Sequence, residues 1–304
     1  MERIGIIGAG VVGRATGRGF SELGHKVVFA DTDHNIVHTL RREGYNAIDP
    51  AALATAQPSV IMICVPTPND GDGRQDLTPL SAAIGAIGPV LASDGYHLVV
   101  VRCTVLPAVT ERLVIPALEA WSGAKAGRDF GVCMNPEFLR ETSAEDDFRK
   151  PWIAVIGELD KRSGNHLERL YRPLCRRSGA PIFRTDLRTA EMMKYAHNLF
   201  NATKISFANE MWLACRELGI DGNQVMALVA QSAEAMWNPR YGIRGGSRFG
   251  GNCLPKDTEA LANLARDLGW DMPLLEATID VNRRVEQIAA LRPALIERVS
   301  SAAS

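Results

Sequence analysis

The sequence has almost no excess charge of either sign, since 34 lysines and arginines stand against 35 aspartates and glutamates. A net charge of −1 does not indicate a nucleic acid or an anionic membrane as a partner, because both attract strongly basic surfaces. Long hydrophobic stretches are also missing, and apolar runs such as Val60–Val65 are too short to cross a bilayer. The amino terminus enters a strand pattern at once and shows no secretory pattern. These absences are typical of an ordinary soluble enzyme.

Cysteine is scarce and unpatterned. The six cysteines stand at positions 64, 103, 133, 175, 215 and 253, with no C-x-x-C pair and no framework spacing. We therefore expect reduced, mostly buried thiols in a cytoplasmic protein, and no metal site. A chain of 304 residues is long enough for two domains and a sizeable core.

A glycine pattern opens the chain. The apolar strand Arg3–Ile7 runs into Gly8, Gly10 and Gly13, and a helix follows. In a dinucleotide-binding turn these glycines allow a tight turn, close approach to a pyrophosphate, and close packing of helix on strand. The helix N-terminus then offers its N–H groups to the phosphates, and the first helical residues of the pattern are Val11 and Val12.

An acidic residue strengthens this interpretation. A second strand, Lys26–Ala30, ends at Asp31, which suits the ribose hydroxyls of NAD and repels a 2′-phosphate. The sequence therefore predicts NAD binding. The alternative is a structural glycine turn in an α/β domain that has no ligand.

Hydrophobic periodicity predicts the architecture. Up to about Thr185, short apolar runs alternate with amphipathic stretches, which indicates an α/β fold with a Rossmann-like doubly wound parallel sheet. After Thr185 the pattern is helical, so we expect an NAD-binding domain over 1–185 and an all-helical dimerisation domain over 186–304. A long junction helix runs from Asp186 to about Leu218. The expected strands are Ile4–Ile7, Val27–Ala30, Ser59–Val65, Leu98–Val101 and Ile153–Ile156. The further expected helices are Asn223–Glu234, Lys256–Leu268 and Pro273 to about Arg298, before a frayed tail, Ser300–Ser304.

The segment from Phe249 to Asp257 places Cys253 in a glycine-flanked turn. The residues from Pro255 onward predict a helix start, which puts this thiol near the positive end of a helix. A nearby helix N-terminus or cation makes a thiol reactive near neutral pH. The alternative is an inert cysteine beside a structural turn.

Three further patterns combine polar side chains. Thr104 follows a strand, at the edge of an open α/β sheet where ligands bind. Glu137 and Glu141 flank Arg140, and Lys194 and Asn198 are spaced i, i+4 on one helix face. Each pattern also has a plain structural explanation, as a turn residue, a solvated charge cluster or surface positions of a helix.

Taken in order, these segments resemble the UDP-glucose/GDP-mannose dehydrogenase family over nearly the whole chain. The glycine pattern is shared with many dehydrogenases, whereas the Cys-Leu-Pro-Lys-Asp block is specific. The segments that carry the resemblance are Gly8–Gly13, Val65–Pro68, Asn135–Glu141, Lys194–Asn198, Asn209–Glu210 and Gly250–Asp257.

The resemblance implies oxidation of a primary alcohol to a carboxylic acid with two NAD. Cys253 attacks the aldehyde-level intermediate to form a thiohemiacetal, and a second hydride transfer gives a thioester that water hydrolyses. Lys194 and Asn198 stabilise the oxyanion. Asp257 positions or activates water, with Thr104 holding it, and Glu137 serves the hydrolysis. The resemblance also assigns Thr67, Thr104, Glu141 and Lys256 to the cofactor, and Glu137, Phe138, Leu139, Arg140, Glu141, Lys194, Asn198, Arg248 and Gly250 to the substrate.

The sequence also departs from the family pattern. Family members carry a C-terminal domain that binds the nucleotide of the sugar nucleotide, whereas these 304 residues end just after the helix that leads into it. We therefore expect a short member without that domain. The stretch Gly44–Pro58 is too short for the family's Pro-Gly-Leu segment, and Ala108 stands where the family has glycine.

These departures leave the substrate open between a nucleotide sugar and a smaller alcohol. For a smaller alcohol, Arg240, Arg244 or Arg248 would pair with an anionic group of the substrate. An alternative of another class is a catalytically silent NAD-binding or scaffold homologue. The long helix predicts a homodimer, with Phe200, Ile205, Phe207 and Trp212 at the interface; otherwise these side chains pack within the subunit.

Overall fold

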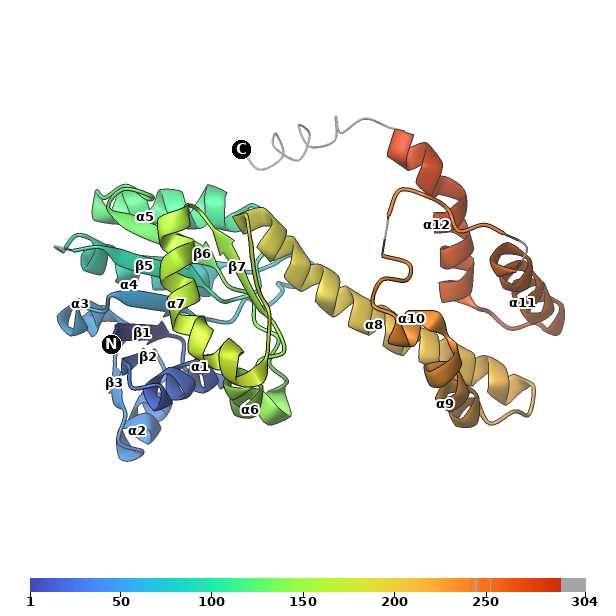
Figure 1. Ribbon diagram of the computed structural model, residues 1–304, viewed down its shortest axis with the longest axis horizontal. Helices are drawn as coiled ribbons and strands as arrows, with labels where there is room; N and C mark the ends of the chain where they lie inside the picture. Colours follow the sequence, from blue (N-terminus) through green and yellow to red (C-terminus); the bar gives the residue numbers. More distant parts are fainter. Residues whose placement is uncertain (94, 244, 252, 291–304) are drawn as a thin grey trace. The chain divides into compact units, whose positions relative to one another are not determined.

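The computed structural model describes residues 1–93, 95–243, 245–251 and 253–290, and the chain divides into two compact units, 1–198 and 199–304 (Figure 1). The division falls inside helix α8 (Leu187–Glu217), whereas the sequence places it at the start of this helix. The reason is that Leu187, Ala190 and Lys194 are buried, and the first two belong to the hydrophobic core of the first unit.

The first unit contains an eight-stranded sheet in the order β3-β2-β1-β4-β5-β6-β7-β8. Its central strands are buried along their whole length, as expected for strands covered on both faces. The strands are β1 (Arg3–Ile7), β2 (Lys26–Ala30), β3 (Asn46–Ile48), β4 (Val60–Ile63), β5 (His97–Val101), β6 (Phe130–Met134), β7 (Ala154–Glu158) and β8 (Ile182–Thr185).

Neighbouring strands of the sheet run parallel, as predicted, with one exception: β7 runs antiparallel to β6. Between these two strands the chain forms only a 3₁₀ turn, Glu141–Ser143, and the short helix α6 (Ala144–Arg149). A parallel return needs a long crossover along the strands, usually a helix. The segment after β6 therefore stays at the carboxyl edge, and β7 returns in the opposite direction.

Helices cover both faces of the sheet (Figure 1). Residues of β4 alternate between two hydrophobic clusters, with Met62 in one and Ile61 and Ile63 in the other. The first cluster includes side chains of α1 and α7, and the second includes side chains of α4 and α5. The helices and helical turns of this unit are α1 (Val11–Glu22), α2 (His34–Arg42), η1 (Pro50–Ala52), α3 (Leu53–Ala56), α4 (Thr78–Leu91), η2 (Thr110–Val114), α5 (Ile115–Ser122), η3 (Glu141–Ser143), α6 and α7 (Lys161–Ser178).

The described residues of the second unit form helices and connecting loops, with a longer non-helical stretch between Trp237 and Leu254. Its small core contains Ala214, Ala265 and Met272. The predicted helices are present with shifted bounds, and the predicted extension to Arg298 and the tail Ser300–Ser304 lie outside the described residues. Besides the rest of α8, this unit comprises α9 (Gly222–Ser232), α10 (Glu234–Trp237), α11 (Leu254–Leu268) and α12 (Pro273–Ala290).

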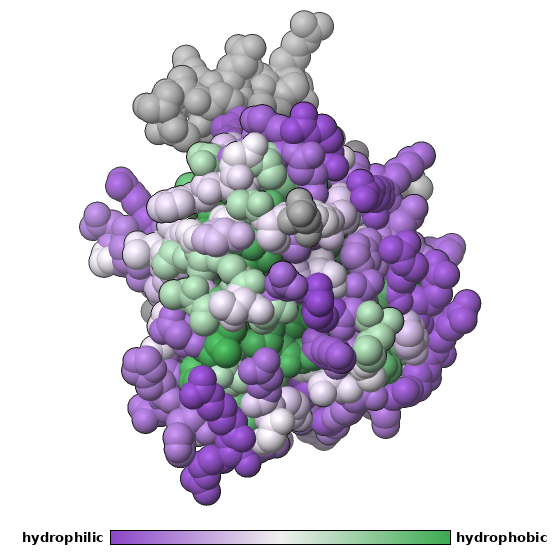
Figure 2. Space-filling model, turned by 90° about the vertical axis from the view of Figure 1, so that its left-hand side faces the viewer, coloured by the Kyte–Doolittle hydropathy of each residue, from purple (hydrophilic) through white to green (hydrophobic). Residues whose placement is uncertain are grey.

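One face of the molecule shows hydrophilic residues around a smaller hydrophobic area (Figure 2). Within the described part of the chain, none of the helices combines the length and the apolar character needed to span a membrane.

Candidate active site

The glycine turn after β1 depends on two glycines that admit no side chain. Gly8 has a φ of +87°, and a Cβ there would lie 2.7 Å from the carbonyl oxygen of Cys64. A Cβ at Gly13 would lie 1.9 Å from the carbonyl oxygen of Gly8, so the turn and helix α1 pack backbone on backbone. Gly10 differs, because no atom lies within 4 Å of its Cβ position. The turn is therefore tight inside and open on the side that a phosphate would approach.

Asp31 lies directly after β2, beside this turn. Its Oδ2 accepts a 2.6 Å hydrogen bond from the N–H of Ala9, and its Oδ1 accepts one from the N–H of Asp33 at 2.9 Å. Each carboxylate oxygen has a further lone pair for a ribose hydroxyl. The backbone thus fixes the acid in the position that the sequence predicts.

A pocket of about 530 Å³ follows the carboxyl edge of the sheet from this turn. Val11 and Val12 line it beside Gly8, Gly10 and Asp31. The N–H groups of the first turn of α1 have no partner within the helix and suit a diphosphate. The residues present therefore fit NAD. At the other end, the pocket is lined by Thr67, Thr104 and Glu137.

The backbone at Thr104 is held by two side chains from the segment after β4. Thr67 donates its hydroxyl to the carbonyl oxygen of Thr104 at 2.7 Å, and Gln75 donates its amide to the same oxygen at 2.7 Å. The Gln75 amide also lies 3.3 Å from the hydroxyl of Tyr195. The sequence gives no signal for Gln75 beyond its place in a polar loop.

Two cysteines in this pocket are not nucleophiles. Burial raises the pKa of Cys64 to about 11 and that of Cys103 to about 12, so both thiols stay protonated near neutral pH.

Lys194 of α8 binds Glu137, which lies in the segment after β6. The ammonium of Lys194 donates to the backbone oxygen of Glu137 at 2.5 Å and pairs with its Oε1 at 2.9 Å. Phe138 lies beside this pair, with the ammonium 5.4 Å from its ring centroid and the ring of His197 at 4.8 Å. Burial and the Lys194 cation lower the pKa of His197. Asn198, one turn beyond Lys194, is exposed.

Hydrogen bonds among the residues next to Glu137 stabilise the turn that follows β6. Glu137 accepts the N–H of Leu139 at 2.7 Å. Arg140 is bound by Asp147, a nearly buried acid that accepts its backbone N–H and two guanidinium N–H groups. Asp147 has no distinctive spacing in the sequence and was not predicted. Glu141 is exposed and lines a polar pocket of about 460 Å³ with Val11.

Cys253 lies in the second unit, where it is the N-cap residue of α11 and is exposed. Its carbonyl oxygen accepts the N–H of Asp257 at 2.9 Å. Lys256 and Asp257 form an exposed ion pair. The predicted position of the thiol at a helix start is thus correct. No atom lies within 4 Å of the Cβ position of Gly250, so the turn before Cys253 is open there.

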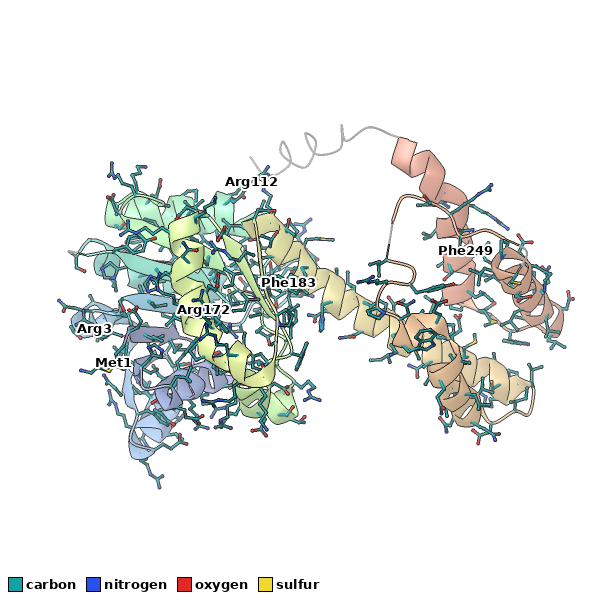
Figure 3. All side chains as sticks on the ribbon, viewed as in Figure 1. Met1, Arg3, Arg112, Arg172, Phe183 and Phe249 are labelled. Atoms are coloured by element: carbon teal, nitrogen blue, oxygen red, sulfur yellow. The ribbon has the colours of Figure 1, made fainter. Side chains whose placement is uncertain are left out.

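Phe249 belongs to the loop before α11 and lies beside α12 (Figure 3), where its backbone bonds to the side chain of Asn282. These residues and Arg248 line a largely apolar pocket of about 670 Å³ in the second unit. Arg240 is exposed, and Arg244 lies outside the described residues. Asn282 was not predicted from the sequence. Among the described residues no cluster suits a metal ion.

Comparison with protein families matches most of the chain. Residues 48–175 match the UDP-glucose/GDP-mannose dehydrogenase family, NAD binding domain, and residues 188–284 match the central domain of the same family. Residues 3–72 match NADP oxidoreductase coenzyme F420-dependent.

Individual relatives cover nearly all of the chain. It is 40% identical to the GDP-mannose 6-dehydrogenase of Pseudomonas syringae pv. tomato, over 92% of this chain and 68% of that protein. It is 36% identical to a UDP-glucose 6-dehydrogenase of Haloferax volcanii, over 92% of this chain and 69% of that protein. The chain thus spans about two thirds of the length of these relatives.

Two solved structures have a similar fold. A GDP-mannose dehydrogenase from Pseudomonas aeruginosa in a ternary complex has a TM-score of 0.87 at 37% identity, covering 94% of this chain and 69% of that chain. A UDP-glucose dehydrogenase from Pyrobaculum islandicum has a TM-score of 0.72 at 37% identity, covering 93% of this chain and 68% of that chain.

Proposed function

The chain belongs to the UDP-glucose/GDP-mannose dehydrogenase family, and we propose that it oxidises the primary alcohol of a nucleotide sugar to a carboxylate. As a member it is an NAD-dependent dehydrogenase that acts on a CH–OH group. GDP-mannose is the first candidate substrate, because relatives named GDP-mannose 6-dehydrogenase share 37–40% identity with the chain. UDP-glucose is the second, because a relative at 36% identity carries its name.

The observation that carries the mechanism is the exposed thiol of Cys253 at the start of α11. Four of the other cysteines are buried, and Cys215 is half-buried. NAD bound at the glycine turn and Asp31 would supply the hydride acceptor for both oxidation steps. Between them, the sulfur of Cys253 adds to the aldehyde carbon, and the carbonyl oxygen takes up a proton. When the hydride leaves the carbon and the proton leaves the hydroxyl of this thiohemiacetal, a thioester remains. Water adds to it, the carbon–sulfur bond breaks, and the carboxylate and the free thiol are released.

The family resemblance supports roles for the remaining polar residues. An ammonium has three N–H donors, and Lys194 uses two of them on Glu137, so the third is left for an oxyanion. Asn198 adds an amide donor, Thr104 and Asp257 serve the hydrolytic water, and Glu137 assists hydrolysis. Glu141, Arg140 and Arg248 keep the binding roles that the resemblance implies.

The homodimer remains part of the proposal. Large hydrophobic side chains of α8 are exposed in the single chain, with exposed fractions of 66% for Phe200 and 63% for Ile205. Such side chains are typical of an interface. Light scattering on the purified chain should give twice the mass of the monomer.

The decisive experiment counts NADH for each sugar consumed by the purified chain. With GDP-mannose or UDP-glucose, conversion to the acid yields two NADH, and small diols and hydroxy acids test the smaller-alcohol alternative. The variant Cys253→Ser should form no acid and bind NAD as the wild type does, because a hydroxyl is a poor nucleophile at neutral pH. The half-buried Cys215→Ser serves as the control and should yield two NADH. Acid formation by Cys253→Ser at the wild-type rate would overturn the mechanism.

A further inference from the structure

We propose that Asn282 is a positioning residue for Cys253, because its side chain anchors to α12 the turn that carries the thiol. This inference rests on the proposed function, in which Cys253 is the nucleophile. Asn282 acts through the backbone of Phe249, and no direct contact with the substrate is assigned to it.

The carboxamide of Asn282 binds both backbone groups of Phe249. Its Oδ1 accepts the N–H of Phe249 at 2.7 Å, and its Nδ2 donates to the carbonyl oxygen of Phe249 at 3.1 Å. One group is a donor and the other an acceptor, so this pairing also fixes which way the amide points. A residue 33 positions away in the sequence thus replaces the hydrogen bonds that a neighbouring strand would supply.

The described residues of the loop before Cys253 are mostly exposed, so the bonds from Asn282 matter for where this loop lies. Residues 245–248 and 250 are exposed. Gly251 has a φ of +80°, and no atom lies within 4 Å of the Cβ positions of Gly250 and Gly251. On the far side of the turn, the hydrogen bond from Asp257 to Cys253 ties the thiol-bearing residue to the first turn of α11. Asn282 therefore holds the upstream end of a turn whose downstream end is a helix.

The helix that carries Asn282 is itself fixed at its first turn. Glu210 of α8, a nearly buried residue, accepts the N–H of Leu274 at 2.7 Å and that of Leu275 at 3.0 Å. These are N–H groups at the start of α12, which lack partners within the helix. Asn282 lies about two turns further along, roughly 12 Å from Leu274 along the axis. Glu210 of α8 therefore fixes the start of α12, and Asn282 of α12 in turn fixes Phe249.

The consequence concerns one step of the reaction. A nucleophile must approach the carbonyl carbon to within about 3–3.5 Å, and a misplacement of roughly 1 Å can cost about 100-fold in rate. The first hydride transfer needs no thiol, whereas formation of the thioester does. A loosened turn should therefore slow the aldehyde-oxidising step and spare the alcohol-oxidising step.

The test compares Asn282→Leu, which has a similar size and no amide, with Asn282→Asp, which keeps the acceptor and loses the donor. Thr278→Ala is the matched control, because it lies one turn earlier on α12 and its hydroxyl donates to the carbonyl of Leu274 within the same helix. The probes are GDP-mannose and UDP-glucose with saturating NAD. NADH is counted per sugar, and free aldehyde is trapped as an oxime. In parallel, hydrogen exchange is measured on the peptide that contains Phe249.

For the wild type and Thr278→Ala we expect two NADH per sugar and no oxime. For Asn282→Leu we expect the aldehyde-oxidising step to slow at least tenfold. The number of NADH formed per sugar should then fall towards one and oxime should accumulate, while the KM for NAD stays unchanged. The amide of Phe249 should exchange at least tenfold faster. Asn282→Asp should show smaller changes of the same kind, a graded response that a purely structural role does not produce.

The outcomes separate this inference from the proposed function. If Cys253→Ser forms acid normally, the proposed function fails, whatever Asn282 does. If Cys253→Ser forms none and Asn282→Leu still yields two NADH without oxime, the inference is wrong even where both steps slow equally. If neither sugar is oxidised, hydrogen exchange decides, since an unchanged rate at Phe249 overturns the anchor and a faster rate confined to that peptide supports it.

Discussion

The ammonium of Lys194 lies 2.9 Å from Oε1 of Glu137, and the two side chains are only 8% and 14% exposed. The pair joins α8 to the segment that follows β6. Because each charge is withdrawn from water, each one requires the other. This ion pair is therefore structural as well as available for chemistry, which sets it apart from the exposed pair of Lys256 and Asp257.

Removing one partner should destabilise the protein more than removing both. Lys194→Met leaves a buried carboxylate without a cation and should lower the free energy of unfolding by about 3 kcal/mol. The double variant Lys194→Met/Glu137→Gln should recover most of that loss. Urea unfolding measures both effects, and Lys256→Met should change the free energy by less than about 1 kcal/mol. Strictly additive effects of the two single substitutions would contradict the coupling.

The first half of the fold could be predicted from the sequence because its signals are local. The glycine turn, the helix α1 and the acid after β2 follow one another within a short stretch, and the structure has them as predicted. Three strands were not predicted. The short edge strands β3 and β8 have only three or four residues, which carry too little periodicity, and the apolar run of the central strand β6 is interrupted by Gly131. The reversed direction of β7 depends on how the segment after β6 folds, which the alternation of apolar runs does not encode.

The candidate site was predictable in its residue types and less so in its contacts. The sequence indicated Lys194 and Glu137 separately, but their pairing spans 57 positions and appears only in the structure. Gln75, Asp147 and Asn282 were missed for a shared reason. Each binds backbone groups of a segment far from it or across a loop, and a hydrogen bond to backbone leaves no complementary residue type in the sequence.

Asp31 should set the choice of cofactor. Its carboxylate is fixed by the N–H of Ala9, so it meets a ribose hydroxyl without reorganising and repels a 2′-phosphate. We expect clear preference for NAD over NADP. Asp31→Ala should weaken NAD binding by roughly 10- to 100-fold, the worth of a hydrogen bond to a charged group, and should erode the preference. Calorimetric titration measures both, with Asp221→Ala, which removes the cap of α9, as the control. Equal affinities in the wild type would show that Asp31 does not read the ribose.

Ala108 has a φ of +76°, a region that disfavours any side chain with a Cβ. Its N–H donates to the buried carboxylate of Glu191 at 2.6 Å, which holds this conformation in place. Ala108→Gly should therefore raise the free energy of unfolding by about 0.5–1 kcal/mol. This is a net figure, from which the larger entropy loss of glycine on folding has been subtracted. Gly123→Ala is the mirror experiment. At a φ of +72° and with open space around its Cβ, it should lower the free energy by about 1 kcal/mol. A destabilised Ala108→Gly variant would contradict the assignment of strain.

Asp147 should make part of the free energy of unfolding depend on pH in the acidic range. The guanidinium of Arg140, with its backbone N–H and the hydroxyl of Ser143, lowers the pKa of Asp147 from 3.8 to about 2. A carboxyl whose pKa is lower in the folded state stabilises that state above the unfolded value, and the contribution is lost as the pH falls from about 4 towards 2.

Wild type and Asp147→Asn should therefore differ by about 1 kcal/mol at pH 7, a modest figure because the side chain of Arg140 is 70% exposed. The difference should shrink as the pH falls towards 2, because the wild-type carboxyl then takes up a proton and loses its pairing with the guanidinium. Urea unfolding at pH 7, 4, 3 and 2.5 follows the change. Arg140→Met, which removes the main donor, should reduce the same acid dependence. A difference between wild type and Asp147→Asn that stays constant down to pH 2.5 would show that this ion pair contributes nothing that acid can remove.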